Sequence, residues 1–332
     1  MPASLEGLED QAIPTLQAAL DPLELGRILR TCFPGQIQGL TETQVQLLRH
    51  HTGKRCVVEI SLWTAAGPLR LIGKVYAKDR SDVYCLMKQV SAAGFGCGKE
   101  FSIPAPVAYV HDLQLLLQEK VEGSQSTESF LSDDDSISRA AADRCALWLA
   151  AFHVRGPLLA SVFRGSSHML SIKQWFFRVA SLESSLANKA RALFTALEYA
   201  ASRLQTNEIM SAVHGDYTHH QVILDQGSTF VTDWDTYGLA DPARDVARFM
   251  VGLQRLALRS RGSIRALDRP AQTFLTTYVT AGRCEVLSRL PFQRAAACLE
   301  HAKHDVHKRD SGWRERAEAT LDEGLRILDT RV

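Results

Sequence analysis

The spacing of apolar residues changes along the chain from helical to alternating and back to helical. Apolar positions three and four residues apart predict a leading helical segment over residues 1–40. Runs of β-forming residues joined by short turns follow it, with one helical stretch over about 81–93 among them. The order of these runs predicts a β-β-β-α-β-β block over about 45–121. We therefore expect an antiparallel sheet with one helix in this part of the chain.

Helical spacing dominates the second part of the chain. The triplet at 133–135 is all aspartate and predicts the start of a helix, because acidic side chains stabilise helix N-termini. Further helical patterns cover about 171–209 and 241–330, and one insert of loops and short apolar runs separates them. These patterns predict an α+β protein with a small antiparallel β-rich lobe over 41–122 and a larger, mainly helical lobe over 123–332.

Composition excludes several classes of protein and partner. The 332 residues are enough for two lobes, and 38 Lys and Arg against 37 Asp and Glu give a formal net charge of +1. A charge this close to zero provides no overall field to attract nucleic acid or an anionic membrane, so we expect neither as a partner. The 45% hydrophobic and 23% charged residues are typical of a globular protein and exclude a largely disordered, collagen-like or coiled-coil chain.

The cysteines and the amino terminus indicate where the protein resides. The seven cysteines are odd in number and scattered, with no CxxC pair. This pattern favours reduced thiols over a disulfide framework or a zinc site. The first ten residues are acidic where a secretory signal would be basic, and no stretch approaches the roughly 18 apolar residues of a membrane helix. We therefore expect a cytoplasmic protein.

The insert between the helical patterns carries the candidate chemistry. Asp216, Asp233 and Asp245 stand at junctions between loops and regular elements, where a helical scaffold can bring them together. Phosphoryl transfer needs one carboxylate to accept the proton of the attacking hydroxyl and oxygen ligands to hold Mg²⁺. A single loop aspartate is better explained as a turn or capping residue, but the spacing of all three favours chemistry.

The spacing matches the kinase pattern H-x-D-x-x-x-x-N, with His214, Asp216 and Gln221 in place of the usual Asn. Downstream, the runs Asp233-Trp234-Asp235 and Asp241-Pro242-Ala243-Arg244-Asp245 follow in order. Over 214–245 the chain resembles the aminoglycoside phosphotransferase and choline kinase superfamily. The resemblance implies a two-lobed protein-kinase-like fold in which Asp216 is the catalytic base and His214 orients its loop. It also implies that Gln221 and Asp233 ligate Mg²⁺ and that Asp245 supports the loop through hydrogen bonds.

In the β-rich lobe the same resemblance implies a nucleotide site for ATP or GTP. Lys74, in the third strand, would contact the α- and β-phosphates; the alternative is a lysine that faces solvent. Glu119 and Val121 would lie nearest the base. Gly53, in the turn between the first two strands, could offer its N–H to a phosphate, although an ordinary turn explains it equally well. The helix at 81–93 lacks the glutamate that pairs with this lysine in protein kinases.

The identity of the phosphate acceptor is the least determined feature. His219, His220 and Asp235 are candidates for acceptor contact. Acidic residues near the site, among them Glu122 and Asp241, favour a cationic acceptor such as an amino sugar, aminoglycoside or amino alcohol. A neutral-sugar kinase similar to maltokinases and a nucleotide-binding pseudokinase are the alternatives, and either a monomer or a homodimer is compatible with the sequence.

Another histidine pattern in the second part of the chain has a simpler interpretation. His301, His304 and His307 follow at intervals of three on a predicted helix, so one face could in principle bind a transition metal. Neighbouring lysine and arginine residues favour a solvated basic face instead.

Overall fold

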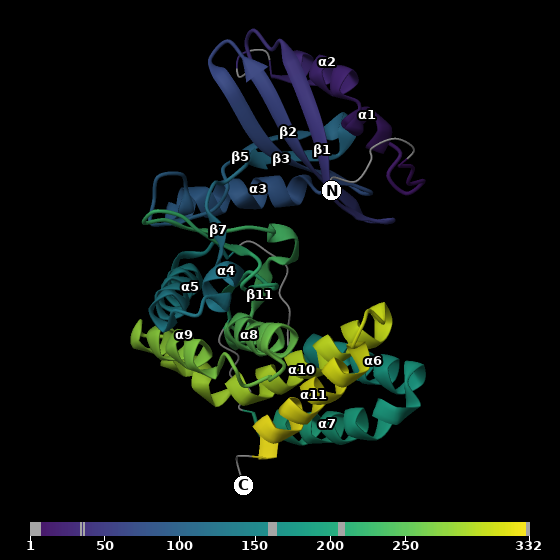
Figure 1. Cartoon of the computed structure of the whole chain (residues 1–332), viewed down its shortest axis with the longest axis vertical. Coiled ribbons are helices and arrows are strands. Elements are labelled where there is room, and N and C mark those ends of the chain that lie inside the picture. The colour runs from purple at the N-terminus through teal and green to yellow at the C-terminus, as the bar shows by residue number, and fades with distance from the viewer. Residues whose placement is uncertain (1–7, 34, 36, 159–164, 205–209, 330–332) are drawn as a thin grey trace. The chain divides into compact units, whose positions relative to one another are not determined.

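The computed structural model describes residues 8–33, 35, 37–158, 165–204 and 210–329. The chain divides into two compact units, Met1–Glu122 and Gly123–Val332 (Figure 1).

The N-terminal unit is built on a five-stranded antiparallel sheet in the order β1-β2-β3-β6-β5. Long strands joined by short turns form the first three positions, as the sequence pattern predicts. Helix α3 and the π-helical turn η1 follow the third strand. The strand and helix bounds are β1 (Glu42–His51), β2 (Arg55–Thr64), β3 (Gly67–Tyr76), α3 (Ser81–Val90), η1 (Ser91–Phe95), β4 (Phe101–Ser102), β5 (Pro106–Val110), η2 (His111–Leu113) and β6 (Leu115–Glu119).

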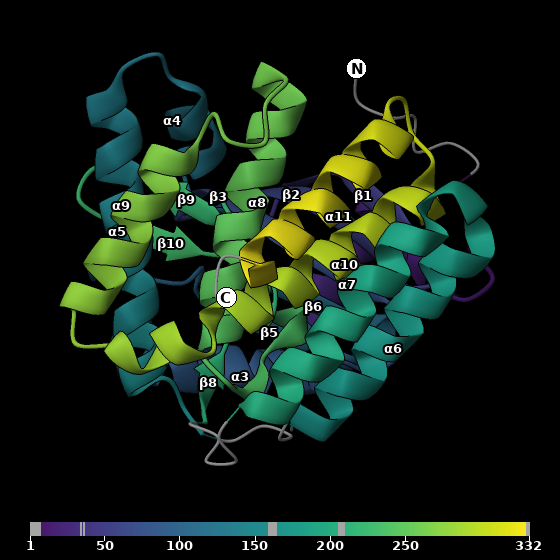
Figure 2. The ribbon, with the colours of Figure 1, turned by 90° about the horizontal axis from the view of Figure 1, so that it is seen from below.

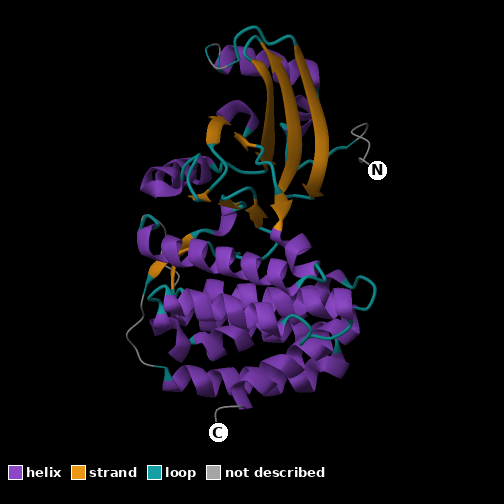
Figure 3. Ribbon diagram, turned by 60° about the vertical axis from the view of Figure 1, so that its left-hand side comes forward, coloured by secondary structure: helices purple, strands orange, loops and turns teal. Residues whose placement is uncertain are grey.

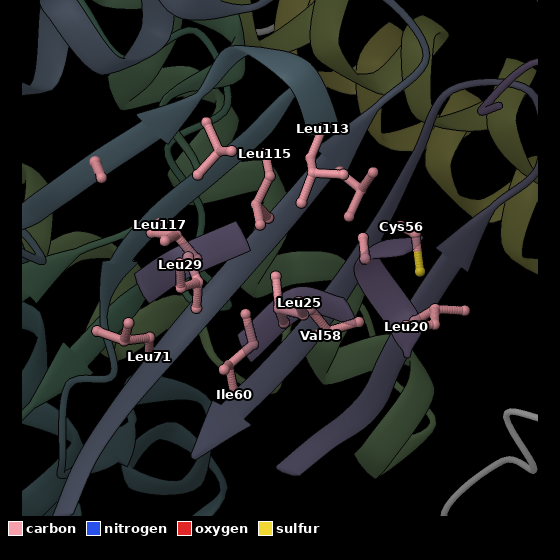
Figure 4. Close-up of a cluster of buried hydrophobic side chains, with 14 of the residues drawn as sticks. Leu20, Leu25, Leu29, Cys56, Val58, Ile60, Leu71, Leu113, Leu115 and Leu117 are labelled. Atoms are coloured by element: carbon pink, nitrogen blue, oxygen red, sulfur yellow. The ribbon is translucent and has the colours of Figure 1, made fainter. Parts of the chain in front are cut away.

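The leading helices pack into the same core as this sheet. They are α1 (Leu16–Leu20) and α2 (Pro22–Cys32), and Asp21 begins α2 by accepting hydrogen bonds from the N–H groups of Leu23 and Glu24. In β2 every second side chain is buried, so one face of the sheet is apolar. Figure 4 shows leucines of α1 and α2 against this face. The labelled residues of the cluster are Leu20, Leu25, Leu29, Cys56, Val58, Ile60, Leu71, Leu113, Leu115 and Leu117.

The C-terminal unit is mainly helical, as Figure 3 shows in purple. Helices α6, α7, α10 and α11 lie side by side and share one apolar core (Figure 2). Asp134 caps the start of α5 by accepting a hydrogen bond from Ser136 N, in agreement with the predicted helix start. The helix bounds are α4 (Ser126–Leu131), α5 (Asp135–Arg155), α6 (Gly165–Leu182), α7 (Ser184–Arg203), α8 (Ala243–Arg261), α9 (Asp268–Thr280), η4 (Cys284–Ser288), α10 (Leu290–Lys308) and α11 (Trp313–Asp329).

Short strands lie among the helices: one of them, β7, precedes α4, and the others lie where the sequence predicts the insert. β9 pairs with β10 as an antiparallel hairpin and also with β7, while β11 pairs with β8. Their bounds, with the 3-10 turn between them, are β7 (Ser124–Gln125), β8 (Ser211–Val213), β9 (Val222–Leu224), β10 (Thr229–Val231), η3 (Trp234–Thr236) and β11 (Gly238–Ala240). The predicted α+β architecture is confirmed.

All seven cysteines lie in the described part of the chain, and each is an unpaired thiol. Within the described residues, none of the helices has the length and apolar composition that crossing a membrane requires.

Candidate active site

A tight loop between β8 and β9 carries the first candidate residues. His214 follows the buried strand β8, and Gly215 has a left-handed backbone with φ +81°. A Cβ at Gly215 would lie well inside 3.0 Å of the carbonyl oxygen of Thr236, so a residue with a side chain does not fit here. The glycine lets the loop pass directly beside the turn η3 and places Asp216 immediately after it.

Asp245, on the first turn of α8, holds this loop through hydrogen bonds to its backbone. Its Oδ2 accepts a hydrogen bond from His214 N at 2.7 Å, and its Oδ1 accepts one from Gly215 N at 2.9 Å. His153 Nε2 lies 3.2 Å from Oδ2, and His153 Nδ1 lies 2.7 Å from the hydroxyl of Tyr278. Burial opposes the ionisation of Asp245, but the hydrogen bonds and charges of the two histidines outweigh it and lower the pKa of this carboxyl. Two helices, α5 and α9, thereby support the loop through one carboxylate.

Buried aromatic side chains pack against one another around the loop. The ring of Tyr217 stacks on Trp148 with centroids 5.8 Å apart, and its hydroxyl donates to Cys145 O at 2.8 Å. Trp234 contacts the ring of His214 edge to face at 4.9 Å and donates from Nε1 to Val231 O at 3.0 Å. These buried side chains join α5, the loop and η3 in one rigid cluster.

Thr232, which lies between β10 and Asp233, connects this segment to Gln221. Thr232 N donates to Gln221 O at 2.9 Å, and Thr232 Oγ1 lies 3.2 Å from Gln221 Oε1. His214 Nε2 donates to Thr232 O at 2.9 Å, which ties the loop to the same residue. Asp233 itself has a left-handed backbone, with φ 65° and ψ 66°. Hydrogen bonds to Thr232 therefore tie the loop and Gln221 to the residue that precedes Asp233.

These oxygen donors fit the requirements of Mg²⁺. The ion prefers hard oxygen ligands, takes one or two carboxylates from a protein and keeps its other positions for water and phosphate oxygens. Asp233 and Gln221 supply one carboxylate and one amide oxygen. Among the described residues no three His, Cys, Asp or Glu side chains gather as a metal site, so the histidines of α10 do not form one.

Two charged residues that sequence reasoning missed complete the surroundings of Asp216. Arg248 of α8 places Nη1 3.2 Å from Asp216 Oδ1 and Nη2 2.6 Å from Oε2 of Glu300 on α10. Burial raises the pKa of Asp216, and the charges of Asp233 and Glu300 add to this, whereas Arg248 and His214 oppose it. Arg248 lies three residues after Asp245 on the same helix, a spacing that puts both on one side of it. No local pattern marks Glu300.

The sequence profile of the phosphotransferase enzyme family matches residues 64–287. The chain belongs to this family. No curated protein sequence matches this phosphotransferase.

Solved structures resemble this phosphotransferase in fold. A thermostable mutant of the aminoglycoside phosphotransferase APH(4)-Ia, in a ternary complex with AMP-PNP and hygromycin B, gives a TM-score of 0.63 at 13% identity, over 91% of this chain and 98% of that one. A choline/ethanolamine kinase family protein from Mesorhizobium loti gives a TM-score of 0.58 at 14% identity, over 96% of this chain and 94% of that one. Choline kinase LicA from Streptococcus pneumoniae gives a TM-score of 0.57 at 15% identity, over 92% of this chain and 98% of that one. The predicted family and kinase-like fold are confirmed.

The predicted acceptor contacts of the phosphotransferase are placed differently from one another. His219 is buried, with Nδ1 2.7 Å from Thr127 Oγ1 of α4, and burial lowers its pKa to about 3. His220 lies against it, with ring centroids 3.9 Å apart, and is exposed. Asp235 is half-buried in η3. His219 thus makes a structural contact with α4, and His220 and Asp235 are the more accessible of the three.

Asp241 and Glu122, whose charges favour a cationic acceptor on sequence grounds, have partners within the protein. Asp241 is buried, accepts a hydrogen bond from Ala243 N at 2.9 Å and lies 3.7 Å from Nη1 of Arg289. Within the N-terminal unit, Glu122 pairs with Arg70 at 3.2 Å.

The predicted nucleotide residues lie on the sheet of the N-terminal unit. Lys74 is buried in β3, between Val57 of β2 and Leu116 of β6 in register. Burial argues against the alternative of a lysine that faces solvent. Glu119 ends β6, and its Oε2 accepts a hydrogen bond from Ala105 N at 3.2 Å. Val121 follows it, half-buried.

Gly53 is the predicted residue that the structure favours least. Its N–H donates to Asp10 Oδ2 at 2.7 Å, and His50 Nε2 lies 2.8 Å from the same oxygen. This hydrogen bond to Gly53 is the main cause of the lowered pKa of Asp10. The N–H expected to meet a phosphate already faces a carboxylate, so the structure favours the ordinary-turn interpretation. Asp10 lies in the leading segment, 43 residues away, where no turn pattern could reveal it.

Proposed function

We propose that this phosphotransferase is a small-molecule kinase that transfers the γ-phosphoryl group of ATP or GTP to a hydroxyl group, with Asp216 as the catalytic base. The observation that carries the proposal is the geometry of one loop. Asp245 anchors its backbone, and Asp216 stands at its accessible end with 38% of the side chain exposed. A fixed, partly exposed carboxylate is what a general base requires.

In this mechanism the chain positions groups more than it reacts with them. Asp216 accepts the proton of the acceptor hydroxyl as that oxygen attacks the phosphoryl group. Asp233 and Gln221 would hold Mg²⁺, which neutralises phosphate charge when it is bound with the nucleotide. His214 and Asp245 keep the loop from shifting, and this matters because a misplacement of ~1 Å can cost on the order of 100-fold in rate.

For the nucleotide, Lys74 would contact the α- and β-phosphates, and the chain at Glu119–Val121 would contact the base. Both assignments rest on the family resemblance and on the place of these residues in the sheet. We do not extend the proposal to Gly53.

The charges around Asp216 bear on the acceptor. A cationic acceptor would need carboxylates without cationic partners, yet Asp216 and Glu300 both face Arg248, and Asp241 lies near Arg289. Arg244, one turn before Arg248, adds another positive charge on α8. This arrangement supports a neutral acceptor, such as a sugar, over the amino sugar, aminoglycoside or amino alcohol that the sequence favours.

Three substitutions test the catalytic assignment. Asp216→Asn is expected to abolish acceptor-dependent nucleotide consumption while the Kd for the Mg²⁺-nucleotide stays within ~3-fold, because the base acts on the acceptor. Asp233→Asn is expected to remove the Mg²⁺ dependence of nucleotide binding, measured by calorimetry. Asp225→Asn, an exposed aspartate in the β9–β10 turn, is the matched control and should change neither. Full turnover in Asp216→Asn would refute the base assignment.

The pseudokinase alternative and the acceptor are tested on the wild-type chain. Glucose, glucosamine and gluconate form a matched set of neutral, cationic and anionic polyols, to which aminoglycosides and choline are added. Nucleotide consumption is followed with ATP and with GTP. We expect turnover with neutral polyols; Mg²⁺-dependent nucleotide binding without turnover on any acceptor would favour the pseudokinase. Turnover confined to the cationic compounds would refute our assignment of the acceptor charge.

A further inference from the structure

The guanidinium of Arg248 joins two carboxylates from different parts of the C-terminal unit. Nη2 lies 2.6 Å from Oε2 of Glu300, and Nη1 lies 3.2 Å from Oδ1 of Asp216. The Arg248 and Glu300 side chains are 16% and 14% exposed, whereas that of Asp216 is 38% exposed. The Arg248–Glu300 pair is thus mostly buried, and Asp216 is the most accessible of the three side chains.

The planar guanidinium makes this arrangement directional. Because its N–H groups lie in one plane, a short contact of Nη2 with Glu300 fixes the direction in which Nη1 points. Nη1 then holds Oδ1 of Asp216, and Oδ2 is the oxygen that can receive a proton from the acceptor. The Asp216 backbone is held separately, through its N–H to His214 Nδ1 at 3.3 Å. Backbone and carboxylate are therefore fixed by different neighbours.

We propose that Arg248 and Glu300 are positioning residues for the base: Glu300 orients Arg248, and Arg248 holds Oδ1 of Asp216 so that Oδ2 faces the acceptor. This inference rests on the proposed function, in which Asp216 is the base. It adds two residues, on α8 and α10, to the predicted loop machinery. Without Arg248 the Asp216 side chain could rotate and would lose its neighbouring positive charge.

The charges that face Asp216 set the sign of each expected change. They come from Arg248 on α8, His214 on its own loop, Asp233 after β10 and Glu300 on α10. Arg248 in turn faces charged or titratable groups of α6, α8 and α10, which are His168, Arg244, Asp245, Glu300, His301 and His304. Arg248→Met removes a stabilising cation, so the pKa of Asp216 should rise. Glu300→Gln removes an anion but keeps an oxygen for Arg248, so the pKa of Asp216 should fall in this variant.

The first measurement is independent of activity. The full chain without ligands is labelled with ¹³C at the aspartate carboxyls, and Asp216 is identified by the resonance lost in Asp216→Asn. We expect its pKa to rise by ~1 unit in Arg248→Met and to fall by a few tenths in Glu300→Gln. Arg248→Lys should stay close to wild type in pKa, and it carries the test together with Glu300→Gln if Arg248→Met does not fold.

The second measurement is the split between kcat and KM on the best acceptor from the screen. Arg248→Met is expected to lower kcat by ~10- to 100-fold with the KM for the Mg²⁺-nucleotide within ~3-fold, because the base is misplaced while nucleotide binding is kept. Arg248→Lys should recover only part of kcat, since an ammonium cannot bridge two carboxylates in one plane. Arg261→Met removes a positive charge at the far end of α8 and is the control.

Each result decides one question. An Asp216 titration that is unchanged in Arg248→Met would overturn the positioning role, whatever the activity. Shifts of the same sign in Arg248→Met and Glu300→Gln would also overturn it, because a general loosening of the fold would produce them. Transfer activity retained in Asp216→Asn would instead refute the proposed function, whatever the titration shows.

Discussion

Replacing Gly215 by alanine tests the packing that positions the loop. Two separate effects are expected, and the chain offers a control that isolates one of them. Gly215 and Gly227 have nearly the same backbone, with φ +81° and +79°. A Cβ at Gly227, in the β9–β10 turn, meets nothing within 4 Å, whereas at Gly215 it collides with the backbone carbonyl of Thr236. Gly227→Ala therefore measures the backbone strain alone.

The magnitudes follow from this difference. An alanine in the left-handed region costs ~1–2 kcal/mol, and this applies to both glycines. At Gly215 the loop and η3 must also separate, yet His214 N and Gly215 N are held by Asp245, and Thr236 Oγ1 donates to His214 O at 3.1 Å. Disrupting this network and the buried carboxylate within it should add ~2–3 kcal/mol. We expect Gly215→Ala to cost ~2–3 kcal/mol more than Gly227→Ala, because the backbone strain is common to both variants.

Urea unfolding of the full chain checks this expectation. Tryptophan fluorescence reports mainly on the C-terminal unit, which holds four of the five tryptophans: Trp148, Trp175, Trp234 and Trp313. The unfolding free energies of the two variants are compared with that of the wild type. Equal costs for the two variants would refute the argument, because they would mean that η3 yields to the added methyl group without loss.

Two other predictions concern buried polar groups away from the reacting oxygen. His219 has a pKa of about 3 when folded and 6.5 as its reference value, so only the unfolded chain binds its proton between these pH values. The stability that the neutral His219 contributes is fully present above pH ~6.5 and is lost as the pH falls, by ~2 kcal/mol at pH 5. His219→Gln should flatten the pH dependence of the free energy of unfolding in urea. An unchanged pH dependence in this variant would contradict the assignment. Arg255 binds Asp305 through two nitrogens at 2.7 and 2.8 Å in the interior. Arg255→Met should cost ~3–5 kcal/mol in the same assay, because the buried Asp305 carboxylate loses its bidentate partner and keeps only a longer contact with Arg316 Nε at 3.8 Å. Adding Asp305→Leu should restore most of this loss; no rescue by the second substitution would argue against the buried charge of Asp305 as the cause.

Much of the fold could be predicted because its signals are local. Alternation in β2, the helix start at Asp134 and the breaks between helices each depend on residues only a few positions apart. The short helix α4 escaped prediction because six residues give too little periodicity. The insert was recognised as strands and loops, but the pairing of β11 with β8 joins segments that no short-range pattern connects.

Local spacing also predicts one part of the candidate site, whereas the other part depends on contacts between distant segments. Spacing within 214–245 marks Asp216, Asp233 and Asp245 as a set, and the family match agrees with the resemblance on which their roles rest. Spacing could not reveal that Asp10 takes the N–H of Gly53, or that Arg248 binds Glu300 from 52 residues away. These partners come from elements that meet only after folding.

The sequence by itself therefore determined the order of the longer helices and strands and the loop that carries the candidate base. Both are encoded in intervals of two to five residues, which a linear chain displays directly. Only the tertiary structure decided which charges surround Asp216, because α8 and α10 bring Arg248 and Glu300 to it from separate parts of the chain. The protonation and orientation of a carboxylate depend on groups within a few ångströms in space, whatever their distance along the sequence.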